Sequence, residues 1–333
     1  MAGSPLPGEG EATMPRGAGT DRATEGRSWR QDVIWRIEAV AFAGFIGLMR
    51  LLGLERASAL GGALLRTLGP VTGTHRTVTR NLRIAFPDMD AGAREALARD
   101  AWEQTGRSFA ETAVMDQLTP ASGRIEIVGA ERLAAIRDSG RPVVFVSGHL
   151  ANFEVMAACI MAAGVKCQIT YRPTNNPYVD RQVRAARARY GVQLFAPKGG
   201  DGARELLAGL GRGESVALMN DQKFNEGPEV TFFDQPVNAA PGPTRLALRF
   251  GTVLQPVSVV RLPGVRFRFV VHDPIEVAST GDRPADIVRG VQAVTRFVED
   301  RVREHPVDWF WVHKRWPDRV YAALDAPSAA GST

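Results

Sequence analysis

The sequence predicts an α/β protein with a mixed, largely parallel central sheet flanked by helices, preceded by an N-terminal membrane-associated helix. Between residues 125 and 304, short apolar runs alternate with longer helical patterns, the order of elements typical of sheets with parallel pairs. Residues 29–68 differ, because an apolar stretch there is flanked and interrupted by arginine and edged by tryptophan. At 333 residues, the chain is long enough to bury a sizeable core.

Changes in composition divide the chain into four segments. Residues 1–28 are rich in Gly, Ala, Pro, Thr and charged residues, so we expect a disordered tail, and they lack the apolar core of a signal peptide. Residues 29–68 are expected to form a membrane-anchoring helical segment. Residues 69–322 are expected to form the α/β domain, and residues 323–333 a disordered C-terminal tail.

The anchor prediction rests on the apolar run Ala39–Met49. Alone it is shorter than the roughly 20 apolar residues that span a bilayer. Extending it from Ile34 to Leu54, with the intervening charges snorkelling, makes it marginal. Trp29 and Trp35 at its leading edge are typical of a membrane interface. We expect an anchor that spans the membrane or lies in its interface; the alternative is an amphipathic core helix.

Turn signals and apolar periodicity define the elements of the α/β domain. Asp90 follows the turn at Phe86-Pro87 and can cap a helix, and the run Val143–Val146 is typical of a buried strand. We expect helices at residues 91–110, 130–139, 152–163, 178–190, 203–210, 242–250 and 285–304, and strands at residues 125–128, 142–147, 168–171, 192–195, 214–219, 230–233, 253–260 and 267–272.

Composition excludes several classes of function. The net charge of +5 fits an anionic partner, but the chain has no nucleic-acid-binding signature, so we expect no nucleic acid partner. Cys159 and Cys167 are interpreted as buried thiols and cannot form a disulfide scaffold or a zinc site. The histidines form no metal-binding motif, and the glycines at 209–213 follow a helix where a dinucleotide loop follows a strand, so no metal or cofactor is expected.

His149 and Glu154 are the strongest candidates for catalysis. His149 follows the predicted strand at 142–147, where an imidazole can act as a base toward a hydroxyl. Residues five apart on a continuous helix point about 140° apart, so the two side chains meet only if His149 lies in a turn before the helix. Gly148 permits that turn. The alternative is a structural histidine, with a glutamate that suits the dipole of the first helical turn.

Four polar residues each follow a predicted strand, namely His149, Arg172, Lys198 and Asp221. Ligands and active residues of α/β sheets gather at the carboxyl ends of strands, which favours the catalytic interpretation of His149. Arg172 is a candidate phosphate clamp or oxyanion stabiliser, with a surface arginine as the alternative. Lys198 precedes two glycines and can contact phosphate; the alternative is an ordinary turn before a helix. Asp221 can order the site or cap a turn.

Five segments, taken in order, resemble the lipid A late (lauroyl/myristoyl) acyltransferase family of Gram-negative bacteria, within the wider glycerolipid acyltransferase group. That group shares a motif of His, four residues, then Asp or Glu, which His149–Glu154 matches. The resemblance extends from about residue 30 to 320, and Asp234-Gln235-Pro236 departs from it where the family often has a glycine. The matching segments are His149–Glu154, Tyr171–Pro177, Asn220–Gln222 with Val230–Phe233, Ala240–Ala247 and Trp309–Trp316.

The resemblance implies an enzyme that moves an acyl chain from an acyl thioester, usually on acyl carrier protein, to a hydroxyl of a lipid acceptor such as a lipid A precursor. It implies a site on the cytoplasmic face of the inner membrane. His149 would be the base and Glu154 would accept its other ring N–H. Arg172, Lys198, Asp221 and Gln222 would bind substrate.

The chain has no G-x-S-x-G serine motif, so we expect direct transfer in a ternary complex. Alternatives are another phospholipid or glycolipid acceptor, a lipid or thioester hydrolase, and a non-catalytic membrane scaffold with the same fold.

Overall fold

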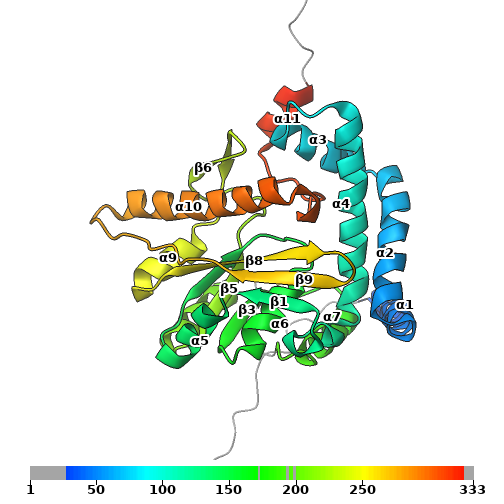
Figure 1. The fold of residues 1–333 in the computed structure, drawn as a ribbon, viewed down its shortest axis with the longest axis horizontal. Coiled ribbons are helices and arrows are strands. Elements are labelled where there is room, and N and C mark those ends of the chain that lie inside the picture. The colour runs from blue at the N-terminus through cyan, green and yellow to red at the C-terminus, as the bar shows by residue number, and fades with distance from the viewer. Residues whose placement is uncertain (1–27, 172, 193–194, 198–199, 326–333) are drawn as a thin grey trace, which may run out of the picture.

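A seven-stranded sheet forms the centre of the computed structural model, which describes residues 28–171, 173–192, 195–197 and 200–325 (Figure 1). The strand order is β1-β9-β8-β2-β5-β3-β4. β8 and β9 pair antiparallel, and the other neighbours pair parallel, which confirms the predicted mixed, largely parallel sheet. The strands are β1 (Ile125–Val128), β2 (Val144–Ser147), β3 (Cys167–Tyr171), β4 (Phe195–Pro197), β5 (Ser215–Met219), β8 (Leu254–Leu262) and β9 (Arg266–Val271).

Helices cover both faces of the sheet. In Figure 1, α10 lies above β8 and β9, and α5, α6 and α7 lie below them. The helices are α1 (Trp29–Leu52), α2 (Leu54–Leu68), α3 (His75–Ala85), α4 (Ala91–Thr112), α5 (Ala130–Ser139), α6 (Glu154–Ala162), α7 (Pro177–Ala188), α8 (Gly200–Gly211), α9 (Gly242–Phe250), α10 (Arg283–Glu304) and α11 (Asp318–Asp325). Residues 323–325 of the predicted C-terminal tail therefore belong to α11.

β2 is buried on both faces, as expected for a central parallel strand. Successive strand residues point to opposite faces, so Phe145 packs in the larger core with α6. Val144 and Val146 pack in a second core with residues of α8 and α9. This double burial explains why the sequence shows a continuous apolar run there, and it holds the end of β2 rigidly.

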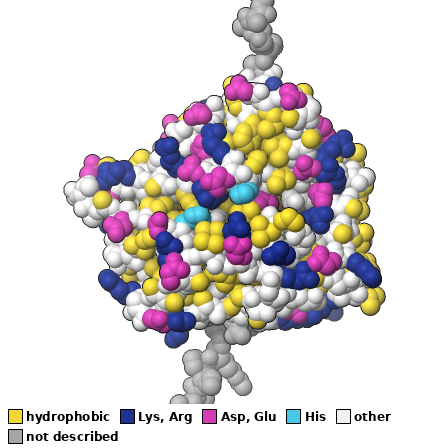
Figure 2. Space-filling view, viewed as in Figure 1, with side chains coloured by type: hydrophobic (Ala, Val, Ile, Leu, Met, Phe, Trp, Pro, Cys, Tyr) yellow, Lys and Arg dark blue, Asp and Glu magenta, His cyan; other side chains and the backbone are white. Residues whose placement is uncertain are grey.

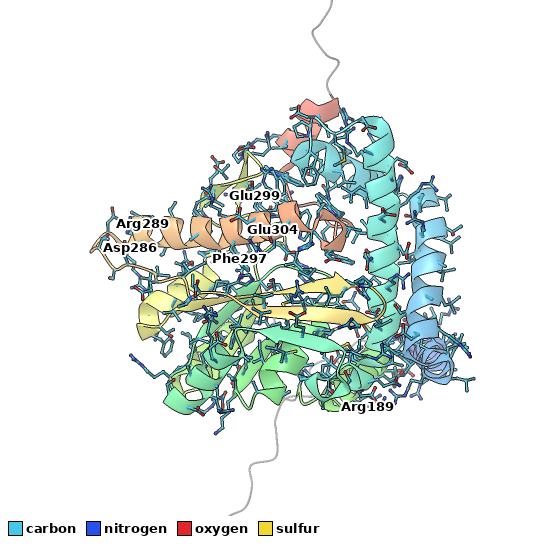
Figure 3. All side chains as sticks on the ribbon, viewed as in Figure 1. Arg189, Asp286, Arg289, Phe297, Glu299 and Glu304 are labelled. Atoms are coloured by element: carbon cyan, nitrogen blue, oxygen red, sulfur yellow. The ribbon has the colours of Figure 1, made fainter. Side chains whose placement is uncertain are left out.

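A two-stranded hairpin of β6 (Glu229–Phe232) and β7 (Gln235–Asn238) packs against α10. The Glu299 carboxylate accepts the backbone N–H of Phe233 at 2.8 Å, and Gln292 exchanges hydrogen bonds with both backbone groups of Thr231. Figure 3 shows Glu299 on the side of α10 nearest the hairpin. The extended segment predicted at 230–233 is thus one strand of a hairpin whose second strand was not predicted.

The N-terminal helices form a layer beside the sheet. In Figure 1, α2 stands alongside α4, and α1 lies at their lower end. α2 and α4 approach so closely that a Cβ built on Gly61 would lie 2.4 Å from the carbonyl oxygen of Gly106, which requires glycine there. Gly53, with φ of 75°, separates α1 from α2. The predicted helical segment at 29–68 is therefore two helices.

α1 contacts the sheet domain through α7. Asn176 donates to the Trp35 carbonyl at 2.8 Å and to the Glu38 carboxylate at 2.9 Å, and Gln182 donates to the Ala39 carbonyl at 3.0 Å. The opposite face of α1 leaves large apolar side chains exposed. No helix among the described residues is long and apolar enough to cross a membrane. Of the predicted tails at 1–28 and 323–333, residues 1–27 and 326–333 lie outside the described residues.

Candidate active site

His149 lies in a loop, residues 148–153, that joins β2 to α6. The strand ends at Ser147, whose hydroxyl donates to the Val257 carbonyl of the neighbouring strand β8 at 2.7 Å. The carbonyl of His149 accepts the backbone N–H of Phe310 at 3.1 Å. The predicted helix at 152–163 begins only at Glu154, because Asn152 and Phe153 still belong to the loop. The imidazole therefore sits in a turn, as the catalytic interpretation requires.

Asp221 is the partner of His149. Its Oδ1 lies 2.7 Å from Nδ1 of the imidazole, and its Oδ2 accepts the backbone N–H of His149 at 2.7 Å. The indole N–H of Trp309 donates to the same Oδ2 at 2.9 Å. β2 and β5 are parallel neighbours with Ser147 opposite Met219, so their carboxyl ends bring the two residues together.

The electrostatic environment keeps Asp221 ionised. Burial would raise the pKa of this carboxyl group, but the charge of His149 and hydrogen bonds from His149 and Trp309 hold the pKa well below its usual range. An ionised Asp221 accepts a hydrogen bond from the Nδ1–H of His149, so the lone pair of the neutral imidazole lies on Nε2. The side chain of His149 is 15% exposed, enough to meet a substrate.

The predicted contact between His149 and Glu154 is wrong. Both Glu154 carboxylate oxygens face α7 and its C-terminal end: Arg187 binds them through two nitrogens, and the Tyr190 hydroxyl donates to Oε2 at 2.6 Å. Glu154 is the first residue of α6, and the turn at Asn152 and Phe153 directs its side chain toward α7. Burial would lower the pKa of Arg187, but the charge of Glu154 raises it above its usual value. A catalytic role for Glu154 stays a prediction.

The structure places the other predicted residues unevenly. Arg172 and Lys198 lie outside the described residues. Asp221, predicted to bind substrate, has its two carboxylate oxygens engaged by His149 and Trp309. Gln222 is the next residue in the same loop and is partly exposed. Among the described residues, no cluster of His, Cys, Asp or Glu side chains could hold a metal ion.

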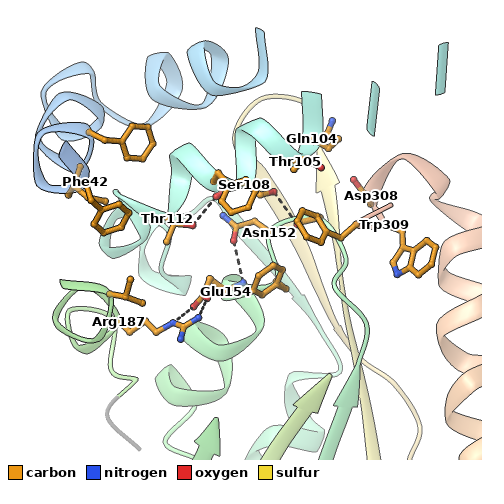
Figure 4. A pocket seen from close by; sticks show the side chains of 17 residues that line it. Phe42, Gln104, Thr105, Ser108, Thr112, Asn152, Glu154, Arg187, Asp308 and Trp309 are labelled. Carbon is orange, nitrogen blue, oxygen red and sulfur yellow. Dashed lines mark hydrogen bonds and ion pairs between the residues drawn. The ribbon is translucent and has the colours of Figure 1, made fainter. Parts of the chain in front are cut away.

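An apolar cavity of about 420 Å³ lies beside the loop at 148–153 (Figure 4). His149 does not line it, but Phe153 and Phe310 do, and their ring centroids lie 5.0 and 6.4 Å from that of the imidazole. Glu154 and Arg187 border the same cavity. Its walls come from α1, α4, α7 and the segment 308–310, and the large apolar side chains among them are Phe42, Phe45, Ile46, Phe109, Phe153, Val183, Trp309 and Phe310.

Sequence reasoning missed two features of this site. It identified Trp309 only as part of the matching segment Trp309–Trp316; the indole is buried, and its N–H binds Asp221. It also missed the partners of Glu154, although Arg187 lies in the basic helix that it predicted at 178–190. The signal for Asp221 was its position after a predicted strand. Had the strand order been known, that position would have been enough to pair Asp221 with His149.

Comparisons with known proteins agree with this architecture. Residues 25–318 match the family described as bacterial lipid A biosynthesis acyltransferase. A lipid A biosynthesis palmitoleoyltransferase of Escherichia coli K12 is 22% identical over 246 residues, which is 72% of this chain and 78% of that protein. A lipid A biosynthesis lauroyltransferase of the same organism is 24% identical over 254 residues, which is 73% of this chain and 79% of that protein. The chain is therefore an acyltransferase and belongs to the bacterial lipid A biosynthesis acyltransferase family.

Proposed function

We propose that the protein transfers a fatty acyl chain from an acyl thioester to a hydroxyl of a lipid A precursor, with His149 as general base and Asp221 as the residue that orients it. The observation that carries the proposal is the 2.7 Å contact between Nδ1 of His149 and Asp221 beside an apolar cavity. Family membership supplies the reaction class.

The proposed chemistry needs one histidine in two roles. Nε2 takes the proton of the acceptor hydroxyl as its oxygen attacks the thioester carbonyl. The tetrahedral intermediate collapses, the carbon–sulfur bond breaks, and the imidazolium returns the proton to the thiolate. Asp221 stabilises the imidazolium between these steps and holds the imidazole in the required tautomer. Glu154 contributes through Arg187, whose guanidinium it holds at the edge of the cavity.

The apolar cavity is the proposed site of the acyl chain. Phenylalanine side chains from α1, α4 and the loops on both sides of His149 line it, so an acyl chain bound there would be removed from contact with water. Each methylene buried in this way contributes about 0.8 kcal/mol. The names of the two relatives differ in the chain they transfer, palmitoleoyl and lauroyl, which fits a family whose cavities differ in size.

Acyl carrier protein is the proposed donor. The net charge of +5 suits an acidic carrier. The test supplies the purified enzyme with a lipid A precursor and either lauroyl-acyl carrier protein or lauroyl-coenzyme A, and analyses the products by mass spectrometry. We expect acylated lipid from the carrier protein and none from His149→Ala. Free fatty acid as the main product would identify a hydrolase, and full transfer by His149→Ala would refute the role of His149.

The exposed face of α1 is the proposed membrane contact, on the cytoplasmic face of the inner membrane. Val33, Ile37, Val40, Leu48 and Leu51 recur at helical spacing and are 44, 63, 73, 47 and 85% exposed. Leu60, Leu64 and Leu68 extend the apolar face along α2. Figure 2 shows apolar side chains among charged ones along the right-hand edge, where Figure 1 places α1 and α2. Such a face suits a helix that lies in the interface.

Charge on that face should weaken membrane binding. We expect Ile37→Glu to shift the protein from anionic phospholipid vesicles to the supernatant in a sedimentation assay. Val288→Glu is the matched control, because Val288 on α10 is 41% exposed and lies outside the proposed face. Equal vesicle binding by both variants would mean that another surface of the protein binds the membrane.

A further inference from the structure

A buried ion pair lies behind the loop that carries His149. Glu111 on α4 and Arg261 at the end of β8 make two hydrogen bonds, of 2.7 and 2.8 Å, in a bidentate arrangement. Their side chains are 0 and 6% exposed. Burying two charges costs much of what their attraction returns, and apolar residues often replace such pairs without loss of stability. The pair therefore calls for a reason beyond stability.

The pair is connected to the catalytic loop from two directions. The Glu111 carboxylate accepts the Asn152 side-chain N–H at 2.9 Å. The backbone N–H of Arg261 donates to the Asp308 carboxylate at 3.2 Å, and the backbone carbonyl of Asp308 accepts the N–H of Ala151 at 2.7 Å. The loop is thus held at Asn152 by the Glu111 carboxylate itself and at Ala151 by Asp308, which in turn binds the backbone of Arg261.

The backbone of Ala151 shows why the loop needs support. Its φ is +42°, in the left-handed region that a residue with a Cβ adopts only under strain. Such conformations persist when the surrounding structure holds them, and they cluster at functional sites. Two residues earlier, the same loop presents His149. Release of Ala151 would therefore change the direction in which the imidazole points.

We propose that Glu111 and Arg261 are positioning residues for acyl transfer: they hold the loop at 148–153 in its strained form so that Nε2 of His149 faces the reacting hydroxyl. This inference rests on the proposed role of His149. The same carboxylate also accepts the Ser58 hydroxyl at 2.6 Å, so the ion pair joins the loop to helices α2 and α4.

Two substitutions separate positioning from stability. Asn152→Ala removes the hydrogen bond to Glu111 on the loop side, and Ser58→Ala removes one to the same carboxylate on the helix side. A misplacement near 1 Å can cost a factor of about 100 in rate. With lauroyl-acyl carrier protein and a lipid A precursor, we expect Asn152→Ala to lower kcat by about 10- to 100-fold with little change in KM. Ser58→Ala should keep the wild-type kcat.

Hydrogen exchange supplies a readout that needs no catalysis. Peptides covering residues 148–153 should exchange faster in Asn152→Ala and in Arg261→Lys, which keeps the charge but loses the fork that binds both carboxylate oxygens. They should exchange at the wild-type rate in Ser58→Ala. We expect Arg261→Lys to retain folding and to show a kcat between those of the wild type and Asn152→Ala.

Two outcomes would overturn the inference. One is wild-type loop exchange in both Asn152→Ala and Arg261→Lys. The other is wild-type kcat in both variants while His149→Ala is inactive. Failure of the proposed function gives a different pattern, because His149→Ala would then stay active while the exchange result still reports whether the ion pair holds the loop.

Discussion

Asp221→Asn tests the central pair of the site with almost no change in shape. Oδ2 of Asp221 accepts two N–H groups, from the His149 backbone and from Trp309. The asparagine oxygen must occupy that position, because an amide NH2 there would face two donors. The amide NH2 then faces Nδ1 of His149, which has to become an acceptor. The proton moves to Nε2, and the base is lost.

The expected loss follows from this change of tautomer. An asparagine in the equivalent role of a hydrolase triad lowers kcat by about 10⁴, and each tenfold step corresponds to about 1.36 kcal/mol of barrier. We therefore expect kcat for acyl transfer to fall by about three to four orders of magnitude, or roughly 4–5.5 kcal/mol, with KM nearly unchanged.

The control is Trp309→Phe, which removes only one of the two donors to Oδ2 and leaves the tautomer in place. Steady-state kinetics and thermal unfolding of each variant complete the assay. A kcat for Asp221→Asn within tenfold of the wild type, in a protein that unfolds at the wild-type temperature, would refute the assignment of Asp221 as the orienting residue.

Three further predictions concern stability and chain selection. Glu154→Gln leaves the charge of Arg187 buried without its partner, so denaturant unfolding should show a loss of about 3 kcal/mol or more, with a smaller fall in kcat than in Asp221→Asn. Burial, with nearby arginines, lowers the pKa of His272 to about 4. The unfolded chain therefore binds a proton that the native protein does not, so stability is lost as pH falls from about 6.5 to about 4, by about 2 kcal/mol after allowance for partial exposure. His272→Gln should show a weaker decline of melting temperature over that range, and an equal decline would contradict the assignment. Val183→Phe narrows the cavity, so competition between thioesters should shift toward shorter acyl chains. We expect the preference to change by about 1 kcal/mol or more in transition-state free energy for each methylene that no longer fits. An unchanged product ratio would show that the acyl chain binds elsewhere.

The sequence predicted the strands of the site well because both are short apolar runs, with β2 fully buried and β5 at least half-buried. It placed His149 and Asp221 at strand ends, and both lie at the carboxyl edge of the sheet. It could not pair them, because the pairing depends on β5 lying between β2 and β3 in the sheet although it follows both in the chain. Strand order arises from packing between distant segments, and no local pattern encodes it.

The error over Glu154 has the same origin. A spacing of five residues made Glu154 the nearest candidate in sequence, and local geometry allowed the contact. The partners that it binds, Arg187 and Tyr190, lie beyond the next strand, so only the packing of α6 against α7 reveals them. The helical segment at 29–68 was predicted from its composition, but its division into α1 and α2 and the close approach of α2 to α4 at Gly61 and Gly106 were visible only in three dimensions.

The contacts made by residues 308–310 imply that the site is completed only after this segment has been synthesised. His149 meets Asp221 72 residues later in the chain, and Asp221 meets Trp309 another 88 residues on. Asp308 also holds the strained Ala151 through its backbone carbonyl. A nascent chain whose residues 308–310 are still inside the ribosome lacks the groups that fix both the base and its loop. Acyl transfer should therefore begin only once residues 308–310 have left the ribosome, and fragments that end before Asp308 should fail to react with thioesters.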